Sequence, residues 1–154
     1  MASPQYVGND YQDSFGFYRI AFVPGQSLAS TGNAVVSLPV LGGGIGSPFG
    51  NGSYIIRRIT VTNPSNSAGG SVPNIATANV VVFTSNDGNT SNAVTTSGGQ
   101  TLGNVTGGNT WQDLTLAAGA ATTAYVAPVL FLKVGTAVAN SAVNISVYGD
   151  IVNL

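Results

Sequence analysis

Aspartates are the main candidates for acid–base chemistry in this chain. Its 154 residues include five Asp but no Glu, His or Cys. Catalytic acids and bases at neutral pH are usually His, Glu, Asp, Lys, Tyr or Cys with shifted pKa values. Without His and Cys, nucleophilic triads built on Ser-His or Cys-His pairs are impossible, as are zinc sites made from these residues.

A pair of carboxylates could still hydrolyse a glycosidic bond, which requires two carboxyl groups flanking the bond. The local sequence favours structural roles instead. Asp87 lies in an Asn-Asp-Gly turn, Asp150 follows a glycine, and Asp113 is expected to point outward from a strand. Asp10 and Asp13 lie in a predicted arm. We therefore expect no catalytic residue, no cofactor and no enzymatic activity.

Two further motifs resemble ligand sites only in part. Asn86, Asp87 and Asn89 form a fragment of a calcium loop, but the terminal Glu of such loops is absent. The glycine-rich segment 42–52 lacks the Lys-Ser/Thr of a phosphate-binding loop. We expect a solvated turn and a flexible loop, with no bound metal and no small-molecule ligand.

The pattern along the chain predicts strands rather than helices. Apolar and polar residues alternate with a period of two, in segments rich in Val, Ile and Thr and separated by Gly, Asn and Pro. The expected strands are 15–23, 33–41, 54–62, 78–85, 93–96, 100–105, 110–116, 129–134 and 143–154. This spacing predicts an antiparallel, jelly-roll-like β-sandwich, as one domain over residues 15–154 after an extended N-terminal arm, residues 1–14.

Two of these strands carry more detailed predictions. Pro39 cannot donate to a ladder, so its strand is expected at a sheet edge or to have a bulge near its end. Strict alternation in 54–62 would place Arg57 and Arg58 on opposite faces, one facing solvent and the other requiring a carboxylate or carbonyl partner.

The low charge of the chain limits its partners. The net charge is −1, only 6% of residues are charged, and 44% are hydrophobic. Four cations are too few for the phosphate contacts of nucleic-acid binding. No apolar run is long enough to span a membrane, and the first residues lack the features of a secretory signal. Such a weakly charged surface favours association with other proteins.

Several side chains are candidate contacts between subunits. The arm carries two tyrosines, and the glycine-rich segment carries two apolar residues outside any strand pattern. Trp111 could stack on a sugar, but burial in the core or in a subunit interface is the favoured interpretation. The candidate contact residues are Tyr6, Tyr11, Ile45, Phe49, Arg57, Arg58 and Trp111.

The runs YIIRRITVTNPSNS, ANVVVFTSNDG and VNISVYGDIVNL resemble the small all-β decoration, or cement, proteins of tailed bacteriophage capsids. The resemblance covers most of residues 33–154 and is one of strand rhythm and composition. It implies a homotrimer between capsomers, bound to the major capsid protein and to its own copies, with the arm gripping one or the other. It also implies a place on the virion surface after synthesis in the host cytoplasm. Two alternatives remain open, a surface adhesin and a carbohydrate-binding module.

Overall fold

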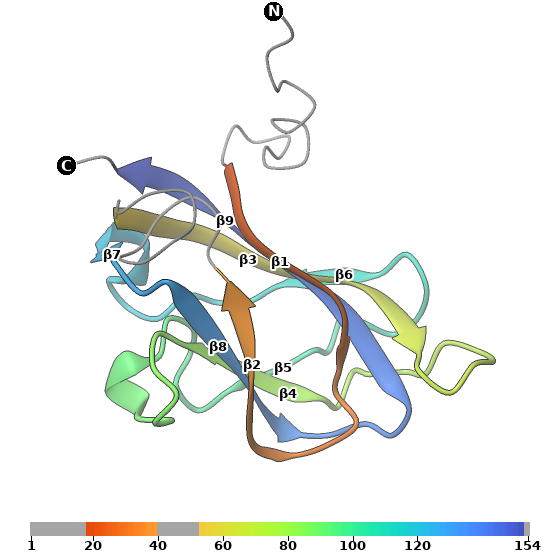
Figure 1. Ribbon diagram of the computed structural model, residues 1–154. Coiled ribbons are helices and arrows are strands. Elements are labelled where there is room, and N and C mark those ends of the chain that lie inside the picture. The colour runs from red at the N-terminus through yellow and green to blue at the C-terminus, as the bar shows by residue number, and fades with distance from the viewer. Residues whose placement is uncertain (1–17, 40–52, 153–154) are drawn as a thin grey trace, which may run out of the picture.

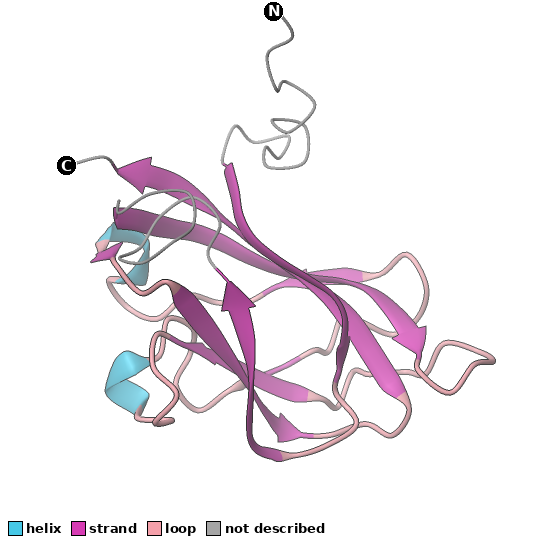
Figure 2. Ribbon diagram, in the orientation of Figure 1, coloured by secondary structure: helices cyan, strands magenta, loops and turns pink. Residues whose placement is uncertain are grey.

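The computed structural model describes residues 18–39 and 53–152, and almost all of its regular secondary structure is β-strand. Two antiparallel sheets form a sandwich, which confirms the predicted fold class (Figure 1). Within the described residues the helical segments are two 3-10 turns, η1 (Thr90–Asn92) and η2 (Ala120–Thr122) (Figure 2). The predicted arm, residues 1–14, lies outside the described part of the chain.

The first sheet contains the longest strands and has the order β1-β9-β3-β6, with β7 also paired to β3. Its strands are β1 (Tyr18–Ser27), β9 (Ser141–Val152), β3 (Ser53–Asn66), β6 (Trp111–Asp113) and β7 (Ala124–Tyr125). The second sheet has the order β2-β8-β4-β5. Its strands are β2 (Gly32–Pro39), β8 (Val129–Thr136), β4 (Asn79–Phe83) and β5 (Gln100–Thr101).

The core lies between the sheets and is built from the inward side chains of each strand. Both sheets contribute branched aliphatic residues that are almost completely buried: Ile20, Ile56, Ile59, Val61, Ile145 and Val147 from the first, and Val80, Val82, Leu130, Leu132 and Val134 from the second. Full burial of one such side chain contributes about 1.5–3 kcal/mol. The period of two in the sequence therefore corresponds to real inward and outward faces.

A β-bulge at Arg57 overturns the prediction of strict alternation in β3. Ile56 pairs with Gly149 and Arg58 pairs with Tyr148, so Arg57 is an extra residue in the ladder with β9. A bulge shifts the inward and outward pattern by one position. Arg58 consequently does not share a face with the buried Ile56, as strict alternation would have required.

β3 also runs further than the sequence predicts, because a second bulge accommodates its proline. The expected strand, 54–62, ends before Asn63-Pro64, whereas β3 continues to Asn66. The register shifts between Thr62 and Ser65, and Asn63 has a φ of 51°. Asn tolerates this left-handed conformation, which allows the residue without an N–H to lie at a bulge.

The weaker predicted strands are shorter than expected. Segment 93–96 forms only isolated bridges, 100–105 is reduced to β5, and 110–116 is reduced to β6. Side chains replace ladder bonds there: Gln112 accepts from the N–H of Asn104 and donates to the carbonyl of Thr101. In contrast, the edge position predicted from Pro39 is confirmed, because β2 is at the end of its sheet.

Candidate interaction surface

The side of the first sheet that faces away from the core carries arginines and aromatic residues. Registered partners in an antiparallel pair project to the same side, so the pairing defines rows across the strands. The first row is Arg19, Tyr148 and Arg58; the second is Phe22, Ser146, Thr60 and Asp113; the third is Asn144, Thr62 and Trp111. We call these ten residues the outer face.

Arg58 lies at the β3 end of the first row and contacts residues of β6 and β9. Its Nε donates to Asp113 Oδ1 at 2.9 Å, and the Thr60 hydroxyl donates to the same oxygen at 2.6 Å. The guanidinium carbon lies 5.6 Å from the ring centroid of Trp111 and 5.9 Å from that of Tyr148. Both distances are within the range of cation–π attraction. These contacts fix the orientation of the Arg58 side chain relative to the Trp111 and Tyr148 rings.

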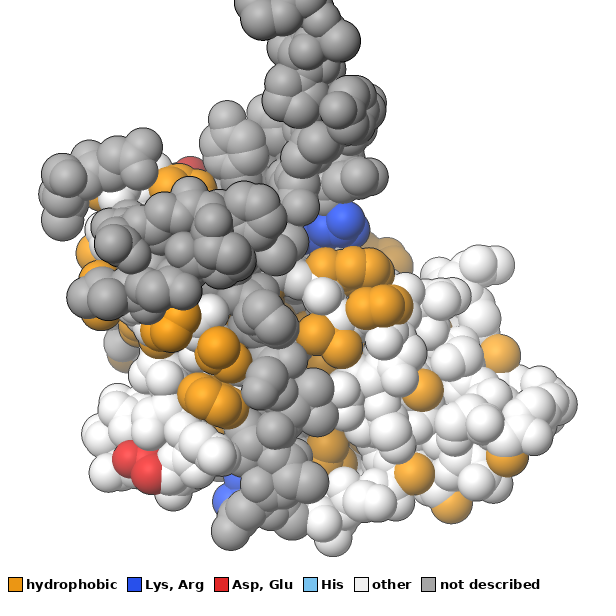
Figure 3. Space-filling model, viewed as in Figure 1, with side chains coloured by type: hydrophobic (Ala, Val, Ile, Leu, Met, Phe, Trp, Pro, Cys, Tyr) orange, Lys and Arg blue, Asp and Glu red, His pale blue; other side chains and the backbone are white. Residues whose placement is uncertain are grey.

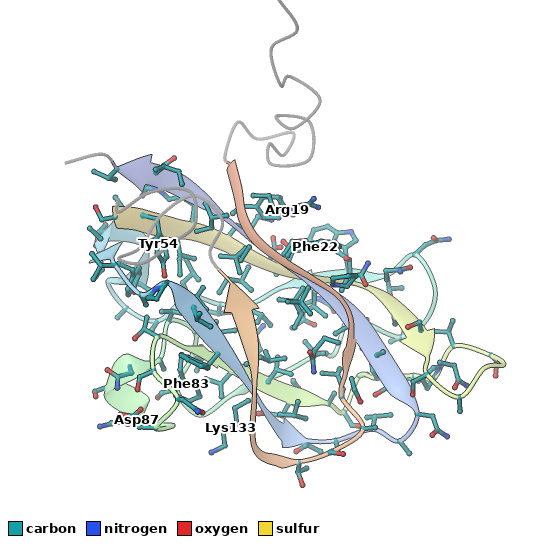
Figure 4. All side chains as sticks on the ribbon, in the orientation of Figure 1. Arg19, Phe22, Tyr54, Phe83, Asp87 and Lys133 are labelled. Atoms are coloured by element: carbon teal, nitrogen blue, oxygen red, sulfur yellow. The ribbon has the colours of Figure 1, made fainter. Side chains whose placement is uncertain are left out.

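Arg19 lies at the β1 end of the outer face and is less completely paired. Its guanidinium carbon lies 4.3 Å from the ring centroid of Phe22, and Figure 4 shows both side chains projecting from β1. Within the described residues, Nε of Arg19 is buried and has no hydrogen-bond partner. A buried donor on a charged group is costly to leave unpaired. Among the described residues of the outer face, Arg19 is therefore the side chain that has a buried nitrogen without a hydrogen bond.

Trp111 is the largest exposed apolar side chain of the described residues. It has 54% of its surface exposed, which corrects the part of the prediction that placed it in the core. Beneath the larger side chains, the hydroxyl residues Thr60 and Ser146 are only 4% exposed. The outer face thus has a covered polar centre with an exposed indole at one border, on β6, an edge strand of the first sheet.

Arg57 makes a separate contact at the end of the sheet. Its Nε donates to Asp150 Oδ2 at 2.7 Å, and Nη1 donates to the carbonyl of Ala121 at 2.6 Å. About a third of the side chain is exposed. Such surface pairs contribute about 0–1 kcal/mol. Arg57 and Arg58 therefore both pair with an aspartate. The sequence had predicted a partner for one of the two arginines and a solvent-facing position for the other.

Charge is unevenly distributed over the described residues. Arg19, Arg57 and Arg58 all belong to the first sheet, and two of them carry aspartate partners from the same sheet. Asp87 and Lys133 lie toward the opposite end of the molecule from Arg19 (Figure 4). Figure 3 shows basic side chains bordered by hydrophobic ones near the top of the view. The combination of arginines with aromatic rings is thus a property of the first sheet.

The Asn-Asp-Gly segment folds as the predicted turn. The Asp87 carboxylate accepts from the Asn89 N–H at 2.9 Å and from the Asn92 side-chain amide at 3.1 Å. These hydrogen bonds lower the pKa of Asp87 below its usual value. Gly88 supplies the positive φ of 66°. The acceptor oxygens are thus used within the turn, and no three potential metal ligands come together among the described residues.

A shallow cavity of about 200 Å³ lies between η1 and η2. Hydroxyl, amide and methyl groups line it, from Thr84, Asn92, Ala120, Thr123 and Tyr125 among others. Burial raises the pKa of the Tyr125 phenol above its usual value. Among the described residues that line the cavity there is no carboxylate, arginine or lysine, and hence no acid–base pair.

The candidate contact residues divide into three groups. Tyr6, Tyr11, Ile45 and Phe49 lie outside the described residues. Arg58 and Trp111 come together on the outer face. Arg57 instead donates hydrogen bonds to Asp150 and to the carbonyl of Ala121 at the end of the sheet.

Sequence reasoning did not identify Arg19, Phe22, Asp113 and Tyr148 as members of this surface. One signal was available, because Arg19 is the only charged residue in the otherwise apolar segment 15–23. A lone charge in such a segment indicates an outward position. The other three residues could be placed only by knowing which strands pair.

No family model, curated protein or solved structure matches this chain. The part of the chain that the structure describes contains no helix with the length and hydrophobicity of a membrane span.

Proposed function

We propose that this protein is a non-enzymatic structural component of a virion, which decorates and stabilises a bacteriophage capsid. It acts as a homo-oligomer, expected to be a trimer, that bridges capsomers through contacts with the major capsid protein. The outer face is the observation that carries the proposal. Trp, Tyr and Arg are the residues most enriched at the energetic centres of protein interfaces, and Trp111, Tyr148 and Arg58 lie together there.

The distribution of charge supports a protein contact over catalysis. The described aspartates are held in ion pairs or in a turn: Asp113 with Arg58, Asp150 with Arg57, and Asp87 with its neighbours. A chain with so few charged groups gains little from electrostatic repulsion in solution. A surface of this kind is suited to being covered by other subunits.

The native mass of the purified protein tests the oligomer, and imaging of particles carrying it tests the location. We expect a stable homo-oligomer bound at the junctions between capsomers. Trp111→Ala should reduce occupancy on particles, because an anchoring indole is lost. Val126→Ala is the matched control, since Val126 is half exposed but lies outside the outer face. A monomer that does not bind particles would contradict the proposal.

A carbohydrate-binding or adhesin function is the second candidate, and the exposure of Trp111 favours it. Trp111 pairs with Thr62 across the ladder, so an exposed indole that could stack on a sugar ring shares a face with a hydroxyl residue that could bind a sugar hydroxyl. A glycan array separates the two functions. Dose-dependent binding that Trp111→Ala abolishes would favour sugar recognition, whereas no binding favours the structural role.

A further inference from the structure

Nε of the Arg19 guanidinium has no hydrogen-bond acceptor among the described residues. Arg19 lies in the first row of the outer face, and its Nε is buried without a hydrogen bond within the described residues. A guanidinium pairs best with a carboxylate, often through two parallel hydrogen bonds. An occupant of this face should therefore carry a carboxylate.

The carboxylate side chains of this chain leave two candidates. Asp113 and Asp150 already pair with Arg58 and Arg57, and Asp87 accepts hydrogen bonds within its own turn. Asp10 and Asp13 remain, and both belong to residues 1–17, outside the described part of the chain. In an assembly made of this chain alone, they are the side-chain carboxylates left for Arg19.

The composition and length of residues 1–17 also suit the outer face. The segment carries two aspartates, two tyrosines and two phenylalanines but no lysine or arginine. Its side-chain charge is −2, whereas the ten residues of the outer face sum to +1 (Arg19, Arg58 and Asp113). Asp10 and Asp13 precede Arg19 by nine and six residues, which span at most about 30 and 20 Å when fully extended, compared with about 15 Å across four strands. The two aspartates can therefore extend past the edge of the sheet to a copy that lies beside it.

We propose that residues 1–17 of one copy dock on the outer face of a neighbouring copy, where Asp10 or Asp13 pairs with Arg19 and the aromatic side chains cover Trp111. This inference rests on the homo-oligomer of the proposed function and adds to it the surface that receives the segment. Each copy would both donate a segment and accept one.

Cross-linking between two variants of the full chain tests the docking in trans. The chain has no cysteine, so Gln12→Cys in one variant and Thr62→Cys in another provide unique reactive sites. Gln12 adjoins Asp13, and Thr62 pairs with Trp111 in the ladder. We expect a short bis-maleimide to join the two variants when they are assembled together. Replacing Thr62→Cys by Thr90→Cys, an exposed position at the second sheet, is the matched control and should give little product.

Charge variants then test the role of Arg19. In the Gln12→Cys and Thr62→Cys background, Arg19→Gln, or Asp10→Asn with Asp13→Asn, should reduce the cross-linking yield to that of the Thr90→Cys control. Asp87→Asn removes one carboxylate elsewhere and should leave the yield unchanged. Trp111 is the only tryptophan, so its fluorescence reports on the same face: we expect stronger acrylamide quenching in the Asp10→Asn/Asp13→Asn chain.

The outcomes distinguish this inference from the proposed function. An oligomeric native mass with no cross-link, or with the control yield, would overturn the docking and leave the oligomer standing. A chain carrying both cysteines that reacts only within itself would show that the segment binds its own copy, which also overturns docking in trans. A monomeric native mass would overturn both the oligomer and the docking.

Discussion

Tyr54 shows at the scale of one residue how a polar group is accommodated in this core. The side chain is fully buried, and its hydroxyl donates to the carbonyl of Ala127 at 2.7 Å. Its ring centroid lies 6.0 Å from that of Tyr125. Burial, with a smaller contribution from Tyr125, raises the pKa of the Tyr54 hydroxyl well above its usual value. The phenol therefore stays neutral in the folded chain and ties β3 to the segment before β8.

Tyr54→Phe should lower the free energy of unfolding at neutral pH by about 0.5–1.5 kcal/mol, because one buried hydrogen bond is lost. The substitution should also change the alkaline side of the stability profile. A phenol with a raised pKa in the folded state contributes stability below the unfolded value, about pH 10, and loses it as the pH rises further. Urea unfolding at several pH values measures both effects. Tyr148→Phe, on the outer face, is the control, and an equal loss in both variants would contradict this account.

At the scale of elements, the β3–β9 ladder organises the first sheet. β9 is the partner of both β1 and β3, and the bulge at Arg57 lies opposite the Tyr148–Gly149 step. At Gly149 a Cβ would meet the carbonyl oxygen of Ile55 and the Cα of Ile56. Both are backbone atoms, which cannot move aside as a flexible side chain can. The close approach of the two strands at the bulge therefore depends on glycine.

Gly149→Ala should destabilise the fold by about 1–3 kcal/mol, since overpacking must displace one strand from the other. Gly103→Ala is the matched control, because a Cβ there meets nothing within 4 Å and the position does not have a positive φ. Chemical denaturation of the two variants gives the comparison. Equal stability of both would show that the β3–β9 ladder is looser than the structure indicates.

At the scale of the whole molecule, the small number of ionisable groups should produce a flat response to pH. The chain has no histidine or cysteine, so no side chain has an unperturbed pKa between 5 and 8. Hydrogen bonds lower the pKa of Asp87 in the folded state. The stability that this group contributes is present above its unfolded pKa, about 4, and is lost as the pH falls through the folded value.

Stability and native mass should therefore be constant from pH 5 to 8, with acid destabilisation only below about pH 4. Asp87→Asn should make the acid side of the profile less steep. Thermal unfolding and light scattering across the pH range measure these properties. A sharp midpoint near pH 6.5, in stability or in assembly, would contradict the prediction.

The sequence alone predicted much of the fold. Alternating apolar residues indicated the long strands, Pro39 indicated an edge strand, and Asn86-Asp87-Gly88 indicated a turn. These features follow from local rules: side chains alternate along a strand, proline lacks a donor, and glycine adopts positive φ. The same composition limited the available chemistry, because a residue type that is absent cannot contribute to a site.

Only the tertiary structure decided how the candidate interaction surface is built. The ion pair between Arg58 and Asp113 joins residues 55 positions apart, and the bulge at Arg57 appears only when β3 is aligned with β9. The exposure of Trp111 depends on β6 lying at the edge of the first sheet. Local periodicity gives each strand two faces, but it does not specify which strands become neighbours or where one residue is added to a ladder. Those depend on long-range packing, which is why the sequence determined the strands while the fold determined the surface.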